Sequence, residues 1–269
     1  MNKALMVLAA LALAGCATEP AATARKSDKP AIVFVCAHPD DTEGFAGTAF
    51  LLRDKYDIHI VDLTTGEYGL GEKGWKDGST AKIRRAEEER ACAFLGATPH
   101  FLGEVDAPGE CHASKRATDR LIAIMEELRP VALFTHWPLD THSDHIMTFA
   151  AVHKAVNLMG GATPEIYYME EPHQSKNFQP DHYVYINHVR EKKNEIIRCY
   201  ECQNRNDGLV RRKMQQSAER GRDVWTPAHH CEAYASFNNR AYGRPPYGTV
   251  PKVFADMDEK PGETKKEGK

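Results

Sequence analysis

The residues that decide the fold read "AIVFVCAHPDDTE" and occupy positions 31–43. Residues 31–37 form an apolar run that predicts a strand. A histidine, two adjacent aspartates and a glutamate follow within residues 38–43. A chain rarely places so much charge at the end of a hydrophobic strand without a use for it. The segment therefore predicts a functional site at the carboxyl end of this strand.

Strands and helices alternate along the chain after this segment. Alternation of this kind implies crossover connections between parallel strands, and hence a Rossmann-like three-layer α/β fold with a mostly parallel sheet. The apolar patterns and their capping residues predict strands at 31–37, 58–64, 99–103, 131–137 and 165–170, and helices at 44–55, 81–96, 114–129, 145–159 and 188–203.

Composition limits the class of protein. The chain has 269 residues, a formal net charge of −3, 42% hydrophobic residues and 9% aromatic residues. These values are typical of a globular protein that buries a core, and residues 31–255 suit one α/β domain. A net charge this close to zero gives no sign of a basic nucleic-acid surface, so we expect no nucleic-acid partner.

The first sixteen residues, "MNKALMVLAALALAGC", have the layout of an export signal. A lysine near the start precedes an apolar stretch that is short for a membrane span, and small residues follow up to Cys16. The ending "LALAGC" is similar to the lipobox of bacterial lipoproteins, in which the cysteine is lipidated. A plain secretory signal cut near residues 14–17 is the alternative. Ala17, in place of an aspartate, favours a lipid anchor at the periplasmic face of the outer membrane.

Polar segments without periodicity flank the domain. Residues 17–30 are rich in Ala, Thr, Pro and Lys and predict a flexible tether. Residues 256–269 predict a disordered tail. Of the seven cysteines, six remain after Cys16, and their spacing leaves the disulfide pairing open. Cys199 and Cys202 have the spacing of a redox motif, but they fall within the predicted helix 188–203, which argues against redox catalysis.

Three charged segments follow three of the predicted strands. They are "AHPDDTE" at 37–43, "TTGEYG" at 64–69 and "THWPLDTHSDH" at 135–145. Ligands of open α/β sheets collect beyond the carboxyl ends of the strands, so these segments converge on one edge. One acidic loop is often just a solvated surface, whereas three such loops at one edge predict a site.

The residue types in these segments suit a divalent metal. Hydrolytic zinc sites have three protein ligands and keep a position open for water. One aspartate of "HPDD" can bind the metal together with His38 while the other faces the water, because neighbouring side chains diverge. "HSDH" at 142–145 supplies a second imidazole. Two nitrogens and one oxygen form a donor set that suits zinc.

The two motifs together resemble the PIG-L/LmbE-like zinc N-deacetylases, which include the deacetylases of mycothiol and bacillithiol synthesis. The resemblance runs from about residue 31 to residue 203 and includes "TGEYG" and "RRAEEERACAFLG". It implies an LmbE-like fold and assigns roles by motif position. The implied zinc ligands are His38, Asp41 and His145. The implied catalytic residues are Asp40 as general base, His142 as the group that stabilises the tetrahedral intermediate, and Asp144 as the carboxylate that orients His142 and raises its pKa.

Two further positions match residues that contact substrate in the family. Arg84 matches an arginine that contacts the substrate, and the alternative is a surface arginine paired with Glu88 four residues along the helix. Asp106 matches a position that can bind sugar hydroxyls, and the alternative is an ordinary turn aspartate.

The sequence therefore predicts an exported, lipid-anchored zinc hydrolase that removes an acetyl group from an amino sugar of the N-acetylglucosamine type. One metal ion is expected, with Fe²⁺ as an alternative to Zn²⁺. The substrate is a small molecule or a glycan, and the oligomeric state is open. Two rival functions are hydrolysis of another acylated amide and carbohydrate binding without catalysis. Export argues against the cytoplasmic thiol-synthesis substrates.

Overall fold

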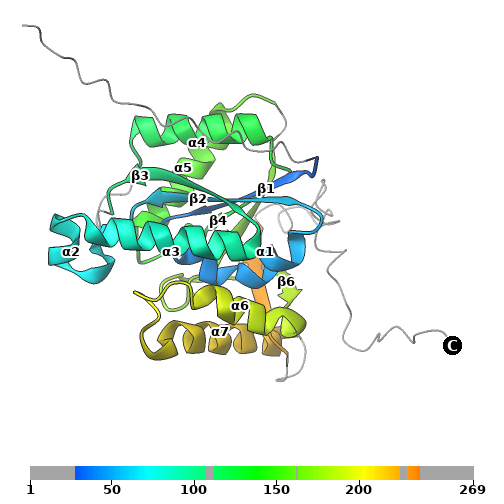
Figure 1. Ribbon diagram of the computed structural model, residues 1–269. Helices are drawn as coiled ribbons and strands as arrows, with labels where there is room; N and C mark the ends of the chain where they lie inside the picture. Colours follow the sequence, from blue (N-terminus) through cyan, green and yellow to red (C-terminus); the bar gives the residue numbers. More distant parts are fainter. Residues whose placement is uncertain (1–27, 107–111, 162, 225–228, 237–269) are drawn as a thin grey trace, which may run out of the picture.

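The computed structural model describes residues 28–106, 112–161, 163–224 and 229–236, which form a mostly parallel sheet covered by helices (Figure 1). The strand order is β3-β2-β1-β4-β5-β7-β6, with β7 antiparallel to both of its neighbours and the other pairs parallel. The strands are β1 Ala31–Cys36, β2 Asp57–Thr64, β3 Thr98–Glu104, β4 Ala132–His136, β5 Glu165–Met169, β6 His182–Tyr185 and β7 Cys231–Ala235.

Helices cover both faces of the sheet. In Figure 1, α4 and α5 lie on one face, α1 and α3 on the other, and α6 and α7 extend that second layer. The α-helices are α1 Ala46–Leu52, α2 Glu72–Lys76, α3 Ser79–Leu95, α4 Lys115–Leu128, α5 Ser143–Leu158, α6 Arg190–Ile197 and α7 Gly208–Val224. Short 3-10 turns are η1 Asp41–Gly44, η2 Glu67–Leu70, η3 Asn187–Val189 and η4 Arg205–Asp207.

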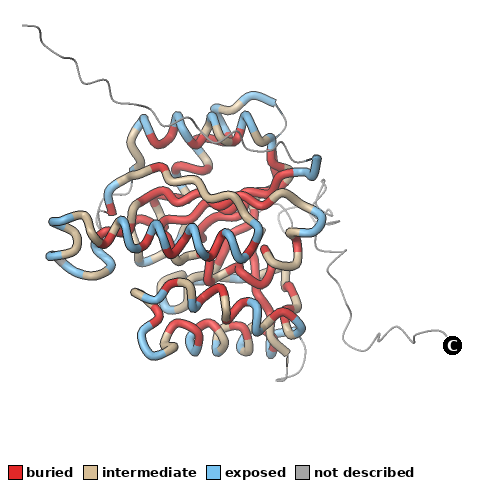
Figure 2. The backbone as a smooth tube through the Cα atoms, viewed as in Figure 1, coloured by how far each residue is buried: buried red, intermediate tan, exposed pale blue. Residues whose placement is uncertain are grey.

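The core has two halves, one on each side of β1. Successive side chains of a strand point to opposite faces, so Ile32 and Phe34 pack with α1, α3 and α6, while Val33 and Val35 pack with α4 and α5. All six residues of β1 are buried, and Figure 2 shows the central strands as the most buried part of the fold. This burial on both faces explains why β1 reads as an unbroken apolar run.

The sheet positions the site through its strand order. From β1 the chain continues to β2 on one side, whereas from β4 it continues to β5 on the other. The loops that leave β1 and β4 therefore diverge, and they leave an open crevice at the carboxyl ends of these two strands. The segments 37–43 and 137–145 lie there.

The predicted α/β fold with a mostly parallel sheet is confirmed, and the predicted strands and helices are present with small shifts at their ends. Gly96 ends α3 in the left-handed conformation, and Ser114 caps α4 by accepting a hydrogen bond from the backbone N of Ala117. The predicted helix 188–203 is wrong in its length. It consists of η3 and α6, and α6 ends at Ile197.

The two cysteines of "CYEC" consequently lie in the turns that follow α6. Both are free thiols, and the Sγ atom of Cys202 donates to Glu87 at 2.9 Å. Burial and the contact with Glu87 raise the pKa of Cys202 to about 12. Little of it is therefore the reactive thiolate at neutral pH.

Among the described residues, four helices or strands lie where none was predicted: α2, β6, α7 and β7. The predicted signal segment with Cys16, most of the tether and the tail lie outside the described residues. Within the ranges that the structure describes, no helix combines the length and the apolar character needed to cross a membrane.

Candidate metal centre

The loop after β1 is shaped by the carboxylate of Asp41. Its Oδ2 atom accepts hydrogen bonds from the backbone N of Ala37 and of His38, each at 2.9 Å. The Nε2 atom of His136, the last residue of β4, lies 3.0 Å from the same oxygen. The side chain of Asp41 is therefore fixed between the two strands of the crevice.

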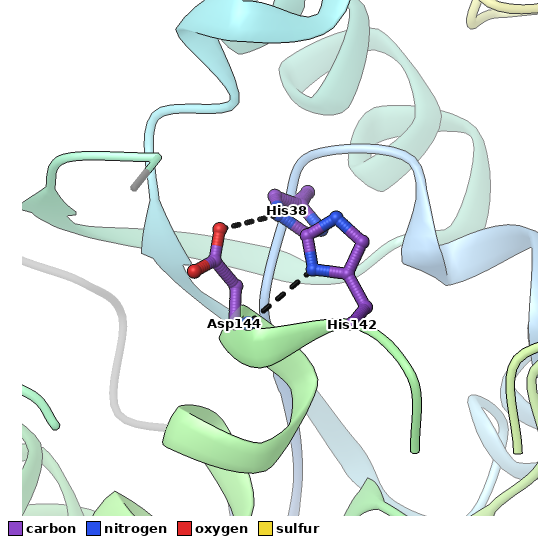
Figure 3. Close-up of side chains that lie close together, drawn as sticks. All are labelled: His38, His142 and Asp144. Atoms are coloured by element: carbon purple, nitrogen blue, oxygen red, sulfur yellow. Dashed lines mark hydrogen bonds and ion pairs between the residues drawn. The ribbon is translucent and has the colours of Figure 1, made fainter. Parts of the chain in front are cut away.

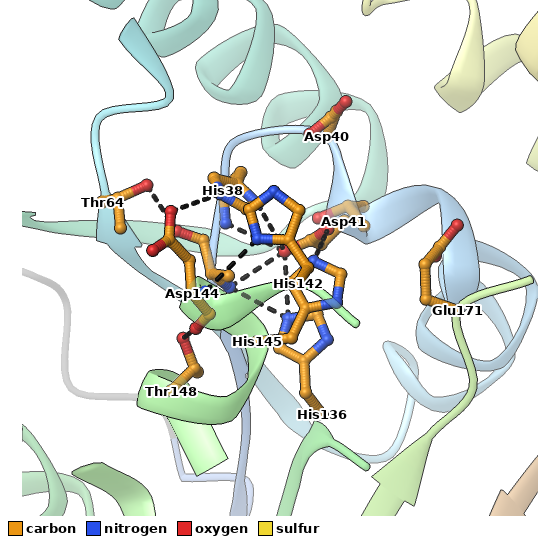
Figure 4. A network of polar contacts seen from close by, with 12 residues as sticks. His38, Asp40, Asp41, Thr64, His136, His142, Asp144, His145, Thr148 and Glu171 are labelled. Carbon is orange, nitrogen blue, oxygen red and sulfur yellow. Dashed lines mark hydrogen bonds and ion pairs between the residues drawn. The ribbon is translucent and has the colours of Figure 1, made fainter. Parts of the chain in front are cut away.

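The three predicted metal ligands lie together at this point (Figure 4). The Nδ1 atom of His38 lies 3.8 Å from Oδ2 of Asp41, and the Nε2 atom of His145 lies 3.8 Å from Oδ1 of Asp41. All three residues are buried, and one ligand atom of each lies within 4.8 Å of the other two. Zinc bonds of about 2.0–2.2 Å require ligand atoms at separations of this order.

Carboxylates lie against the far nitrogen of each candidate imidazole ligand. The Nε2 atom of His38 is 3.1 Å from Asp144 and 3.6 Å from Asp106, and the Nδ1 atom of His145 is 3.4 Å from Asp140. Such partners fix the orientation of a metal-binding histidine and increase its basicity. Asp140 was missed from the sequence because nothing in "PLDTHSDH" marks one aspartate as the partner of a histidine.

The electrostatics of this cluster favour a cation. Burial alone would lower the pKa of His38, but hydrogen bonds with Asp106 and Asp144 outweigh it and raise the pKa to about 10. The three imidazoles around Asp41 overcome the effect of burial and hold the pKa of its carboxyl well below the usual range. The buried Oδ1 atom of Asp144 has no hydrogen-bond partner among the described residues. The donor set and its charge therefore fit a divalent metal.

Asp40 is adjacent to Asp41 but lies outside this donor set. Its backbone has a φ of 124°, a conformation that non-glycine residues rarely adopt, and its carboxylate turns toward Arg84, with which it forms an ion pair. Burial raises the pKa of Asp40 to about 6, against the opposing effect of Arg84. The side chain borders the same pocket as the candidate ligands.

Arg84 is buried, and the alternative of a surface arginine paired with Glu88 is wrong. Besides its ion pair with Asp40, it donates from Nε to the carbonyl of Pro39 at 3.1 Å and from Nη1 to the carbonyl of Gly66 at 3.2 Å. Glu88 instead accepts from Thr42 and other neutral donors. Arg84 reaches the pocket, and its contacts position Asp40.

His142 is near the metal ligands but differs from its predicted environment (Figure 3). Its Nδ1 atom accepts a hydrogen bond from the backbone N of Asp144 at 3.3 Å, while the carboxylate of Asp144 contacts His38. Burial and the nearby imidazoles of His38 and His145 lower the pKa of His142, although Asp144 opposes this. Asp144 therefore acts on the pKa of His142 in the expected direction, but burial and the two imidazoles outweigh it.

These groups line a pocket of about 330 Å³. Asp106 borders it, and its Oδ2 atom accepts a hydrogen bond from the backbone N of Tyr68 at 3.2 Å. Tyr68 stacks on Trp75 with ring centroids 4.6 Å apart. Glu43, Tyr68 and Gly69 of the lining belong to the segments that were expected at this edge of the sheet. The lining also contains residues that were not predicted from the sequence, namely Glu171, Gln174, Gln203, Leu209 and Arg212.

Comparison with known proteins gives a consistent family. The model of the family described as PIG-L: GlcNAc-PI de-N-acetylase matches residues 33–156, a span that holds all three candidate metal ligands. A 4-oxalmesaconate hydratase of Pseudomonas putida is 32% identical over 192 residues, which cover 64% of this chain and 72% of the hydratase.

A deacetylase is related at a similar level. The 1D-myo-inositol 2-acetamido-2-deoxy-alpha-D-glucopyranoside deacetylase of a Mycobacterium species is 31% identical over 167 residues, which cover 52% of this chain and about half, 54%, of that protein. The solved structure of the N,N'-diacetylchitobiose deacetylase of Pyrococcus horikoshii has the same fold, with a TM-score of 0.67 and 19% identity over 83% of this chain and 89% of that one.

Proposed function

Because the chain belongs to the PIG-L/LmbE-like family, we propose that it is a metal-dependent deacetylase that hydrolyses the N-acetyl group of an amino sugar and releases acetate. One observation carries this proposal. His38, Asp41 and His145 converge on one point, and Asp40 borders the same pocket without belonging to that donor set. A binding protein has no need of a carboxylate held apart from the ligands in this way.

The residues fit zinc, and His38, Asp41 and His145 would hold it. Bound there, zinc would lower the pKa of water toward neutrality and polarise the acyl carbonyl. Fe²⁺ suits the same donors, so the identity of the metal is part of the proposal.

Asp40 is the proposed general base. Water must lose a proton when it attacks the amide, and the departing amine must gain one because amide anions leave poorly. A single carboxyl that accepts the first proton and delivers the second balances the reaction. A pKa raised to about 6 suits this exchange near neutral pH. The ion pair with Arg84 orients the carboxylate toward the pocket.

His142 is the proposed hydrogen-bond donor to the oxygen on which negative charge develops. Because its Nδ1 atom accepts from the backbone N of Asp144, a neutral ring carries its proton on Nε2. The ring then has an N–H group available for the substrate without needing to be a cation. A fixed donor of this kind stabilises the transition state more than the amide ground state.

The remaining pocket residues support an amino sugar as substrate. Asp106 borders the pocket and offers oxygens to hydroxyl groups, and Tyr68 presents an aromatic ring that is 38% exposed. Aromatic faces beside polar groups suit the apolar and hydroxyl-bearing sides of a sugar ring. The volume is at the low end of the range of about 300–1,000 Å³ for small-molecule sites.

The test is acetate release from N-acetylglucosamine and its oligomers by purified, metal-analysed protein. We expect release that stops with a chelator and returns with zinc. A metal-loaded protein that binds the sugars and releases no acetate would favour carbohydrate binding without catalysis. Release of a different acid from other acylated amines would favour another amide substrate.

Hydration is the second candidate, and the identity to a hydratase over 72% of its length favours it. A general base and a metal serve the addition of water to a carbon–carbon double bond as well as they serve amide hydrolysis. The two reactions separate cleanly in an assay. Hydration of an unsaturated dicarboxylic acid removes its ultraviolet absorbance and releases no acetate.

We also propose that the chain is exported and anchored through lipidated Cys16 at the periplasmic face of the outer membrane. The support is the sequence of residues 1–17. Labelling of cells with radioactive palmitate tests it. The parent chain should incorporate label and Cys16→Ala should not, and equal labelling of the two would exclude the anchor.

A further inference from the structure

The charged side chains that line the pocket are almost all paired with each other. Asp40 pairs with Arg84. Glu43 and Glu171 both contact the buried amine of Lys213, whose Nζ atom lies 3.1 Å from Glu43 and 2.6 Å from Glu171. Each of these three acids consequently has a cationic partner within the protein.

The two remaining acids of the pocket face imidazoles. Asp106 lies 3.6 Å from Nε2 of His38, and Asp41 lies between His38, His136 and His145. With Asp41 assigned to the metal, every described carboxylate that lines the pocket has a cationic or imidazole neighbour.

Arg212 is the exception among the charged lining residues. It borders the pocket from α7 and is exposed, and in the part of the chain that the structure describes it forms neither an ion pair nor a hydrogen bond. Its backbone is nevertheless fixed, because the adjacent Lys213 is buried in its contacts with Glu43 and Glu171, and Leu209 packs in a small core with Ile197. A cation is thus held at the pocket with its charge uncompensated.

We propose that Arg212 binds an anionic group of the substrate, a carboxylate or a phosphate, and so selects acetylated amino sugars that carry a negative charge. This inference rests on the proposed function, because the sugar is placed in the pocket by that proposal. The planar guanidinium donates two parallel hydrogen bonds, which match the oxygens of carboxylates and phosphates.

A second residue of the pocket lining supports a polar ligand. Gln174 also borders the pocket, and its Oε1 atom is buried without a hydrogen-bond partner among the described residues. Buried polar atoms are almost always bonded, so an unbonded one at a pocket points to a donor supplied by a ligand or by water. A hydroxyl group of the sugar beside the anion would satisfy it.

The same helix provides a matched control. Arg211 is the preceding residue and is also exposed, but it donates to the carbonyl of Asn206 and borders a different depression with Arg198 and Asp207. Replacing either arginine removes one positive charge from α7. Only the replacement of Arg212 removes a charge from the pocket.

The experiment measures binding and turnover separately. Binding of N-acetylglucosamine, N-acetylmuramic acid and N-acetylglucosamine 6-phosphate is measured by calorimetry with the metal-free protein, in which hydrolysis does not proceed and the pair of Asp40 with Arg84 is intact. We expect the better of the two anionic sugars to bind roughly tenfold to a hundredfold more tightly than the neutral one. Adding Arg212→Gln should remove this preference and leave binding of the neutral sugar within about twofold, whereas adding Arg211→Gln should preserve it.

The carboxylate and phosphate sugars distinguish the two sources of charge. A preference for one of them identifies the anion, and a preference that weakens with salt confirms its ionic origin. Equal binding of neutral and anionic sugars, or a preference that survives Arg212→Gln, would overturn the inference.

Acetate release by the parent protein distinguishes failure of this inference from failure of the proposed function. No release from any sugar, together with an anion preference that depends on Arg212, would exclude the deacetylase and keep the anion site. Release from all sugars at equal efficiency, unaffected by Arg212→Gln, would keep the deacetylase and exclude the anion site.

Discussion

Two clusters of buried charge in this protein differ in how completely they are satisfied. At Glu232 on β7, the carboxylate accepts hydrogen bonds from the backbone N of Gly47 and of Thr48 at 2.9 and 2.7 Å, and from Nζ of Lys193 at 2.7 Å. The hydroxyls of Thr48 and Tyr234 add to these. Both oxygens are occupied, and the cluster joins β7, α1 and α6.

The cluster at Asp41 also consists of buried charged and polar groups. Unlike the cluster at Glu232, it contains a buried polar atom that has no hydrogen-bond partner among the described residues. Several imidazoles and carboxylates are packed together, yet the buried Oδ1 atom of Asp144 lacks a hydrogen-bond partner within the described ranges. A satisfied buried network stabilises one structure, whereas an unsatisfied one marks a place where something else binds. The difference separates a structural cluster from a functional one without reference to any relative.

We expect the largest effect from replacing the proposed base. This effect should be limited to the functional cluster at Asp41. Asp40→Asn is expected to lower kcat for acetate release by about 10²–10⁴-fold, because a general base contributes about that much. Asparagine tolerates the positive φ of this position, so the fold should persist. Steady-state kinetics measure the loss, and metal analysis should find zinc at the parent level.

The matched control for this change is Asp54→Asn, at an exposed aspartate beyond α1. It should leave kcat unchanged. Full activity in Asp40→Asn would remove Asp40 from the mechanism.

Replacement at the structural cluster should show the reverse pattern. Glu232→Gln leaves the buried amine of Lys193 without its counter-charge, and breaking a buried pair costs about 3–5 kcal/mol in the free energy of unfolding. Denaturant titration measures the loss. Glu89→Gln, at an exposed pair with Arg85, should change stability by less than about 0.5 kcal/mol.

Measuring the zinc affinity of Glu232→Gln is a second way to distinguish the two clusters. Folded Glu232→Gln should bind zinc as the parent does, because Glu232 touches none of the candidate ligands. A loss of zinc that matches the loss of stability would show that the two clusters form one unit, contrary to the comparison.

A smaller effect should follow from removing the charge of the carboxylate that contacts the candidate ligand His38. The carboxylate of Asp144 lies 3.1 Å from Nε2 of His38, and such partners contribute about 10–100-fold to metal affinity. Asp144→Asn should therefore weaken zinc binding by about tenfold in competition with a chromogenic chelator. Asp119→Asn, at an exposed residue on α4, should not weaken it, and an unchanged affinity in Asp144→Asn would show that His38 needs no carboxylate partner.

A pH-dependent effect concerns a buried acid to which the described residues offer neutral donors and no cation. Glu88 accepts from Thr42, Cys92 and Tyr200, and burial nevertheless raises its pKa to about 7. Since an unfolded glutamate has a pKa near 4.5, the unfolded chain binds fewer protons between these values, and stability falls as pH rises through this window.

Glu88→Gln removes this dependence. The variant should gain stability relative to the parent, by about 2–3 kcal/mol, between pH 5 and pH 8. Parallel denaturant titrations at the two pH values measure the change. A difference between variant and parent that is independent of pH would mean that Glu88 ionises normally in the folded protein.

The sequence predicted the half of the fold in which hydrophobic pattern and capping residues agree. Helix α4 begins at a serine cap, and β1 is a continuous apolar run, so both were placed correctly. Helix α7 was missed because its buried face includes Lys213, which is charged in the sequence and buried only through its contacts with Glu43 and Glu171. No local pattern reveals a pairing between segments so far apart.

The candidate ligands were found from sequence because two dense motifs follow two strands. Their surroundings were predicted less well. The carboxylate of Asp144 was expected beside His142, yet it contacts His38, because His142 caps the start of α5 and bonds to a backbone N–H there. Side-chain orientation at a helix start depends on local backbone geometry, which residue identity and spacing do not specify.

The position of Arg212 has a consequence for how activity and selectivity are encoded. The residues proposed to carry out the chemistry lie between positions 38 and 145, inside the span matched by the family model, whereas Arg212 lies well beyond it. The residues proposed for activity and the residue proposed for substrate selectivity therefore lie in separate segments of the sequence. Substitution at position 212 among relatives that keep Lys213 would give a direct evolutionary route to a new substrate with the reaction machinery left untouched.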